Sequence, residues 1–189
     1  MKPGRNDIDS LSAGDAGALC CATAIRWGGA LGAIAEGFEL GSDYNLVDRG
    51  VRAALSRHQG GEFQRDVISE GHAASWLLGT ILFEKGELAT FLTQGIVVAD
   101  YAMMTARDGD GGSVLKVTLK RAMETARLWP WPVGLVPFSS LAELESKCQE
   151  DDLARILSGG TASLVAGADV EAQRFRSIAE ARQPPPTGT

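Results

Sequence analysis

Apolar residues recur along most of the chain at the spacing of an α-helix, and residues 41–61 are one such segment. Four apolar residues there are spaced three or four positions apart or adjacent, which places them on one face of a helix: Val47, Val51, Ala54 and Leu55. Ser42 or Asp43 can cap the start of this helix, and the Gly60-Gly61 pair can end it. The segment is therefore predicted to be an amphipathic helix with a marked beginning and end.

Similar spacing predicts further helices within residues 13–40, 62–86, 87–112, 114–129, 139–160 and 169–182. The helix that begins near residue 140 has the best start signal, because Ser140 and Glu143 form a capping-box pattern. Gly159-Gly160 supplies its stop. We therefore predict a mainly α protein, a single-domain bundle of about five to seven helices.

One region also fits a different structure. Leu115, Val117 and Leu119 alternate with polar residues, and the Asp-Gly pairs within 108–112 are strong hairpin signals. The runner-up prediction is thus an α+β fold with one β-hairpin around 96–120. Helix is favoured because the helical pattern continues through "KRAMETARL", well past the length of a short strand.

Small residues are concentrated in the first long helix, over residues 13–40. Glycine costs roughly 1 kcal/mol relative to alanine inside an exposed helix, so Gly28, Gly29 and Gly32 need a reason. Gly28 and Gly32 are four apart and form a smooth groove into which another helix can pack closely. They are candidate interface residues, either within the core or between subunits. Alternatively, the glycine pair at 28–29 breaks the segment into two helices.

A segment rich in tryptophan and proline, "LWPWPVGLVPF", occupies residues 128–138. Its three prolines prevent a continuous helix and favour an extended connector. Trp129 and Trp131 lie on the same side of an extended chain, since side chains alternate. We expect the segment either to close one end of the core or to dock into another subunit.

The chain ends add little to the predicted core. We expect residues 1–12 to be a flexible N-terminal segment, 13–183 to form the single helical domain, and 184–189 to be a disordered Pro-rich tail.

Composition and charge narrow the functional classes. A net charge of −6 argues against a general nucleic-acid binder, which needs a basic surface to contact phosphates. Arg26 lies inside the most apolar stretch, and an arginine at bilayer depth costs at least ~2.5 kcal/mol, so no stable membrane span is expected. The N-terminus does not resemble a secretory signal, and the three cysteines do not form a disulfide framework. These features predict a cytoplasmic protein.

Few residues in the sequence are candidates for catalysis or for binding a metal or a ligand. Glu70 and His72 are two residues apart and so lie on different helix faces, which does not suit a di-metal carboxylate site. We expect no metal and no cofactor. Arg26 and Asp100 are charged residues inside apolar runs. They could pair with each other in the core, line a ligand pocket, or lie at a subunit interface.

Three hypotheses of function follow. The first is a non-catalytic helical interaction or scaffold subunit that acts through self-association or a protein partner. The second is a small-molecule-binding or enzymatic domain with an apolar pocket whose candidate residues are Trp27, Trp76, Tyr101, Arg26, His72 and Asp100. The third is a protein that inserts helices into membranes conditionally, using its first long helix and the apolar run 88–104. The sequence favours the first, because no catalytic signature stands out.

Overall fold

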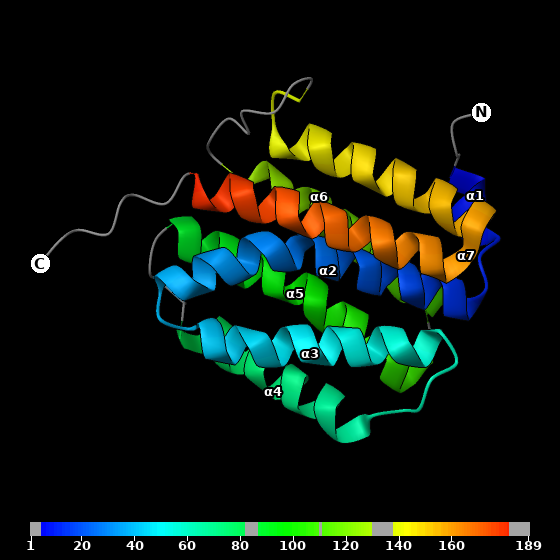
Figure 1. Cartoon of the computed structure of the whole chain (residues 1–189), viewed down its shortest axis with the longest axis horizontal. Helices are drawn as coiled ribbons and strands as arrows, with labels where there is room; N and C mark the ends of the chain where they lie inside the picture. Colours follow the sequence, from blue (N-terminus) through cyan, green and yellow to red (C-terminus); the bar gives the residue numbers. More distant parts are fainter. Residues whose placement is uncertain (1–4, 82–86, 110, 130–137, 182–189) are drawn as a thin grey trace, which may run out of the picture.

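The computed structural model of the protein describes residues 5–81, 87–109, 111–129 and 138–181. Every element within these ranges is a helix, which confirms the prediction of a mainly α bundle (Figure 1). The helices are α1 (Arg5–Asp9), α2 (Ala13–Gly37), α3 (Gly41–His58), α4 (Arg65–Ile81), α5 (Glu87–Asp108), α6 (Gly111–Arg127) and α7 (Leu141–Glu180). Helix α1 falls within the segment 1–12 that we expected to be flexible. The tail 184–189 lies outside the described residues.

Helix α2 is the centre of the bundle. It packs against α3, α5, α6 and α7, while α4 lies in an outer layer against α3 and α5 (Figure 1). Residues on all sides of α2 between Ala16 and Trp27 are buried. A helix that is apolar all round is typical of a core helix, because no face of it needs to meet water. The predicted long helix over 13–40 is therefore confirmed, with no break at Gly28-Gly29.

The glycines of α2 allow neighbouring helices to approach closely. A Cβ atom at Gly29 would lie only 1.8 Å from the carbonyl oxygen of Ala172 on α7. Gly28 and Gly32 face Tyr44 of α3, with their nearest contacts at 3.4 and 3.5 Å. In this structure, the small residues of α2 thus serve packing within the chain.

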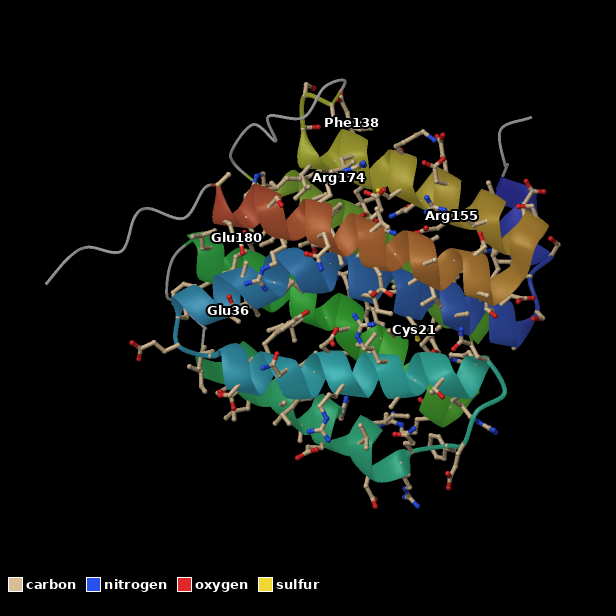
Figure 2. The ribbon with its side chains drawn as sticks, in the orientation of Figure 1. Cys21, Glu36, Phe138, Arg155, Arg174 and Glu180 are labelled. Carbon is tan, nitrogen blue, oxygen red and sulfur yellow. The ribbon has the colours of Figure 1, made fainter. Side chains whose placement is uncertain are left out.

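Helix α7 consists of two halves joined at Gly160, which has a positive φ of 68°. That conformation favours glycine and ends the first half, as the Gly159-Gly160 stop predicts. The two halves run in opposite directions (Figure 1), and the Cys148 thiol of the first donates to Glu171 of the second. The second half also lies against α2, where Arg176 donates to Glu36 at 2.7 Å. Figure 2 labels Glu36 on α2 and Glu180 at the end of this half.

The β-hairpin considered around 96–120 is wrong, because α5 and α6 are helices there. The alternation at Leu115, Val117 and Leu119 does not match the observed burial. Leu115 is buried, but Val117 is 47% exposed, and the next inward position, three residues after Leu115, is taken by the buried Thr118. The Thr118 hydroxyl donates to the carbonyl of Val114 one turn earlier, so a polar residue fits the core face of α6.

Of the two helix N-caps predicted from the sequence, one is confirmed and one is wrong. Ser140 accepts a hydrogen bond from the Glu143 amide as expected, although the Glu143 carboxylate bonds Ser139 rather than the Ser140 amide. The cap predicted for α3 at Ser42 or Asp43 is wrong. That helix begins after Leu40 without a side-chain cap, directly after Glu39, whose backbone has a positive φ of 63°.

Two of the described helices are long and apolar enough to cross a membrane, judged by length and composition alone. They are α2 and the Leu88–Asp108 part of α5. In the folded bundle 89% of the most apolar stretch of α2 is buried, against 56% for α5. Core helices of folded bundles have this same composition, so the feature does not distinguish a membrane helix from a buried one.

Candidate functional site

A cavity of about 520 Å³ opens between α4 and α5. Its wall is mainly apolar, and its residues are Ser75, Trp76, Gly79, Thr80, Thr93, Ile96, Val97 and Asp100. We refer to it as the α4–α5 pocket. Its volume lies within the range of about 300–1,000 Å³ that is common for small-molecule sites.

Helical spacing explains why these residues meet. The lining positions on α4 are 75, 76, 79 and 80, and those on α5 are 93, 96, 97 and 100. Each set follows the three- and four-residue intervals that place side chains on one helix face. Gly79 leaves the wall open, since a Cβ atom there would meet no atom within 4 Å. The pocket therefore exists partly because residue 79 has no side chain.

Asp100 anchors a small polar network at the pocket wall. His72 Nδ1 lies 2.5 Å from Asp100 Oδ1, and the Ser75 hydroxyl lies 3.0 Å from the same oxygen. This differs from a nucleophile relay, in which the serine hydroxyl contacts a histidine nitrogen and the carboxylate contacts the other nitrogen. Here both side chains hold the carboxylate, so the geometry positions Asp100 rather than activating Ser75.

Arg26 lies in a separate, fully buried ion cluster between α2 and the first half of α7. Its guanidinium binds Glu145 through two hydrogen bonds of 3.0 and 2.9 Å and also contacts Asp152. Arg26, Glu145 and Asp152 all have 0% exposed side chains. Arg155 and Gln149 complete the cluster: Arg155 donates to Asp152 at 2.9 Å, and Gln149 donates to Glu145 at 2.7 Å.

A core ion pair between Arg26 and Asp100, one of the alternatives that the sequence left open, is therefore wrong. Arg26 faces α7, whereas Asp100 faces α4. Burial by itself would lower the pKa of the Arg26 guanidinium, but the carboxylates of Glu145 and Asp152 outweigh it and raise that pKa. Arg26 is therefore a charged, structural group in the core.

The three cysteines are buried thiols. Burial raises the pKa of Cys20 to about 12 and that of Cys21 well above its usual value. Cys148 lies beside the Arg26 cluster, and burial, together with nearby acidic groups, raises the pKa of its thiol to about 12, although Arg26 lowers it in part. All three are thus protonated at neutral pH, which disfavours reaction with electrophiles.

We predict that none of the three thiols reacts with dithiobis-nitrobenzoate in the native protein at mildly alkaline pH. The physical reason is that the reagent needs an accessible thiolate. The absorbance of the released product measures the reaction, and unfolding in urea should release the full signal of three thiols. A fast native reaction of even one equivalent would contradict the burial described here.

Aromatic side chains fill the core away from the pocket. Trp27 packs against Phe175 with ring centroids 5.2 Å apart and against Phe91 at 5.5 Å. Trp129 is also buried, and its ring centroid lies 4.9 Å from that of Phe91. Trp129 therefore packs into its own chain. Trp131 and the rest of 130–137 lie outside the described residues, so the closing or docking role of the segment stays a prediction.

No protein family, curated protein or solved structure matches the chain. The assignment of a site therefore depends on geometry. Within the described ranges, no group of three or more His, Cys, Asp or Glu side chains is placed to hold a metal ion.

The structure separates the residues that we expected to line a ligand pocket. Trp76 and Asp100 line the α4–α5 pocket and His72 contacts Asp100, whereas Arg26 and Trp27 lie in the core. Tyr101 does not line the pocket. Sequence reasoning missed Glu145 and Asp152 as partners of Arg26. A signal was present, because these acids are seven residues apart and border the apolar stripe of their helix.

Proposed function

We propose that the protein binds a small, largely apolar molecule in the α4–α5 pocket. The observation that carries this proposal is the combination of an apolar cavity of about 520 Å³ with one carboxylate held in place at its wall. Small-molecule sites commonly pair an apolar enclosure with a few fixed polar groups that orient the ligand. This is the second of the three hypotheses from the sequence.

The proposal can be tested with a substitution whose side chain occupies the pocket. The neutral fluorescent probe N-phenylnaphthylamine, which brightens in apolar surroundings, is titrated into the wild type and into Gly79→Phe. A phenylalanine at 79 has open space to occupy and improves helix propensity, so the variant should fold. We expect the wild type to bind one equivalent and Gly79→Phe to lose at least about 100-fold in affinity, since the ring takes the probe's place.

Gly112→Phe is the matched control. Gly112 is also helical and also has no atom within 4 Å of a Cβ position, but it lies on α6 and not in the pocket wall. This variant should bind the probe as the wild type does. Equal probe binding by Gly79→Phe and the wild type, or no binding to the wild type, would refute the proposal.

The interaction-subunit hypothesis has its own support on α4. Trp76 is 68% exposed and Leu77 is 50% exposed on this outer helix. Large exposed apolar side chains close together often mark association surfaces. If light scattering finds a dimer that Leu77→Glu dissociates, and the probe does not bind, self-association is the better explanation of this face.

A further inference from the structure

The polar atoms of the α4–α5 pocket are mainly hydrogen-bond acceptors. The Thr80 hydroxyl donates to the Trp76 carbonyl at 3.0 Å, and the Thr93 hydroxyl donates to the Ala89 carbonyl at 2.9 Å. The Ser75 hydroxyl has two acceptors within reach, the His72 carbonyl and Asp100. Because a hydroxyl has one proton, each of these groups offers only lone pairs to a ligand.

The Asp100 carboxylate adds a strong acceptor with one oxygen open. His72 and Ser75 both contact Oδ1, and no hydrogen bond from the described part of the chain reaches Oδ2. A carboxylate cannot donate, so His72 donates from Nδ1 and fixes the orientation of the group. The anchored oxygen thus leaves the other one available to a donor in the pocket.

The charges near the pocket also favour a cation. Asp100 is the one charged residue in its described wall. Arg107 lines a smaller neighbouring cavity with His72 and Met104; it is paired with Asp108 at 2.8 Å, and Asp100 interacts with it only electrostatically, as a minor contribution. The Asp100 carboxylate would therefore repel an anionic ligand. Among the described wall side chains, such a ligand could accept a hydrogen bond from the indole N–H of Trp76.

Trp76 contributes a second kind of attraction. Trp76 lines the pocket, and the residue is 68% exposed, so a ligand can reach it. The face of an indole attracts ammonium groups electrostatically, and more strongly than the rings of tyrosine or phenylalanine. A carboxylate and a tryptophan in one apolar wall are the two groups that an organic ammonium ion needs.

We propose that the ligand of the α4–α5 pocket is an organic ammonium ion with an apolar body. The ammonium group donates to Asp100 Oδ2, and the apolar body lies along Ile96, Val97 and the Trp76 ring. Charge-assisted hydrogen bonds of this kind are about twice as strong as neutral ones, so the charge provides selectivity as well as affinity. This inference rests on the proposed binding function and adds the chemical class of the ligand.

The test compares three probes with the same alkyl chain: octylamine, octanol and octanoate, each titrated into the full chain by calorimetry at neutral pH. We expect octylamine to bind at least about tenfold more tightly than octanol, and octanoate to bind most weakly. Asp100→Asn should reduce octylamine affinity about tenfold and leave octanol affinity unchanged, because it removes the charge and keeps the shape.

Asp108→Asn is the matched control, since it removes a neighbouring carboxylate that does not line the pocket. It should change the affinity for octylamine by less than about twofold, as expected for an exposed charge. If Asp100→Asn fails to fold, the order of the three probes on the wild type still decides the question. Equal binding of all three probes would overturn the ammonium inference and leave the binding function standing. Failure of every probe, including N-phenylnaphthylamine, would overturn both.

Discussion

Replacing Arg26 with methionine should lower the free energy of unfolding by about 3–5 kcal/mol. The substitution leaves the carboxylates of Glu145 and Asp152 at 0% exposure without their shared guanidinium. Arg155 still contacts Asp152, but Glu145 keeps only the neutral Gln149 amide as a donor within the cluster. Urea unfolding followed by far-UV circular dichroism measures the loss.

Arg52→Met is the matched control for this experiment. Arg52 also binds two carboxylates, Asp48 at 2.9 Å and Asp169 at 3.1 Å, but its side chain is 47% exposed. Exposed ion pairs contribute about 0–1 kcal/mol, so this variant should remain close to the wild type. Similar losses for Arg26→Met and Arg52→Met would contradict the buried position of the Arg26 cluster.

A triple variant separates charge from packing. Arg26→Met combined with Glu145→Leu and Asp152→Leu removes the buried charges together, and Arg155 is exposed enough to turn toward water. Replacing a whole buried ion cluster with apolar residues is often neutral or stabilising. The triple variant should therefore recover most of the stability that Arg26→Met loses.

Gly29→Ala should destabilise the protein by about 1–3 kcal/mol or more, because it forces α2 and α7 apart. The added Cβ atom would lie 1.8 Å from the Ala172 carbonyl oxygen, and the atom in its way belongs to the backbone and cannot swing aside. The better helix propensity of alanine, worth roughly 1 kcal/mol, does not offset a clash of this kind. Thermal and urea unfolding both report the change.

The neighbouring Gly28→Ala provides the control. Its Cβ atom would lie 3.4 Å from the Tyr44 hydroxyl, which is an ordinary contact. This variant should be neutral or slightly stabilised, since it gains helix propensity without a clash. If the two variants unfold at the same urea concentration, the close contact between α2 and α7 is not present in solution.

Sequence patterns predict the amphipathic helices well because their burial is one-sided. In α3, all four residues of the predicted stripe, Val47, Val51, Ala54 and Leu55, are buried. In the first half of α7, Leu141, Leu144 and Cys148 recur at helical spacing and are likewise buried, although Leu157 is 50% exposed. A period of 3.6 residues carries this information directly.

The partners of α2 could not be predicted in this way. A helix that is apolar all round has no polar face to show which neighbour lies on which side. Asp100 was therefore a reasonable partner for Arg26, although the two side chains face different helices. Which face of a core helix meets which neighbour depends on how the other helices pack.

The sequence allows some residues at the pocket to be selected, but it does not predict the shape of the pocket. His72, Trp76 and Asp100 are unusual enough in their apolar surroundings to be selected from the sequence. Gly79 gave no such signal, because a single glycine in a helix can have several explanations. Only the position of α4 against α5 shows that this missing side chain leaves space for a ligand.

The central position of α2 has a consequence for the synthesis of the protein. Arg26 and Glu145 are 119 positions apart, and α2 is made well before α7. At translation rates of roughly 5–20 residues per second, about 6–24 s pass between the two. During that interval the most apolar helix of the chain lacks one of its main neighbours. Nascent chains should therefore depend on a chaperone until α7 is complete, and ribosome-bound chains stalled before α7 should be the most sensitive to its removal.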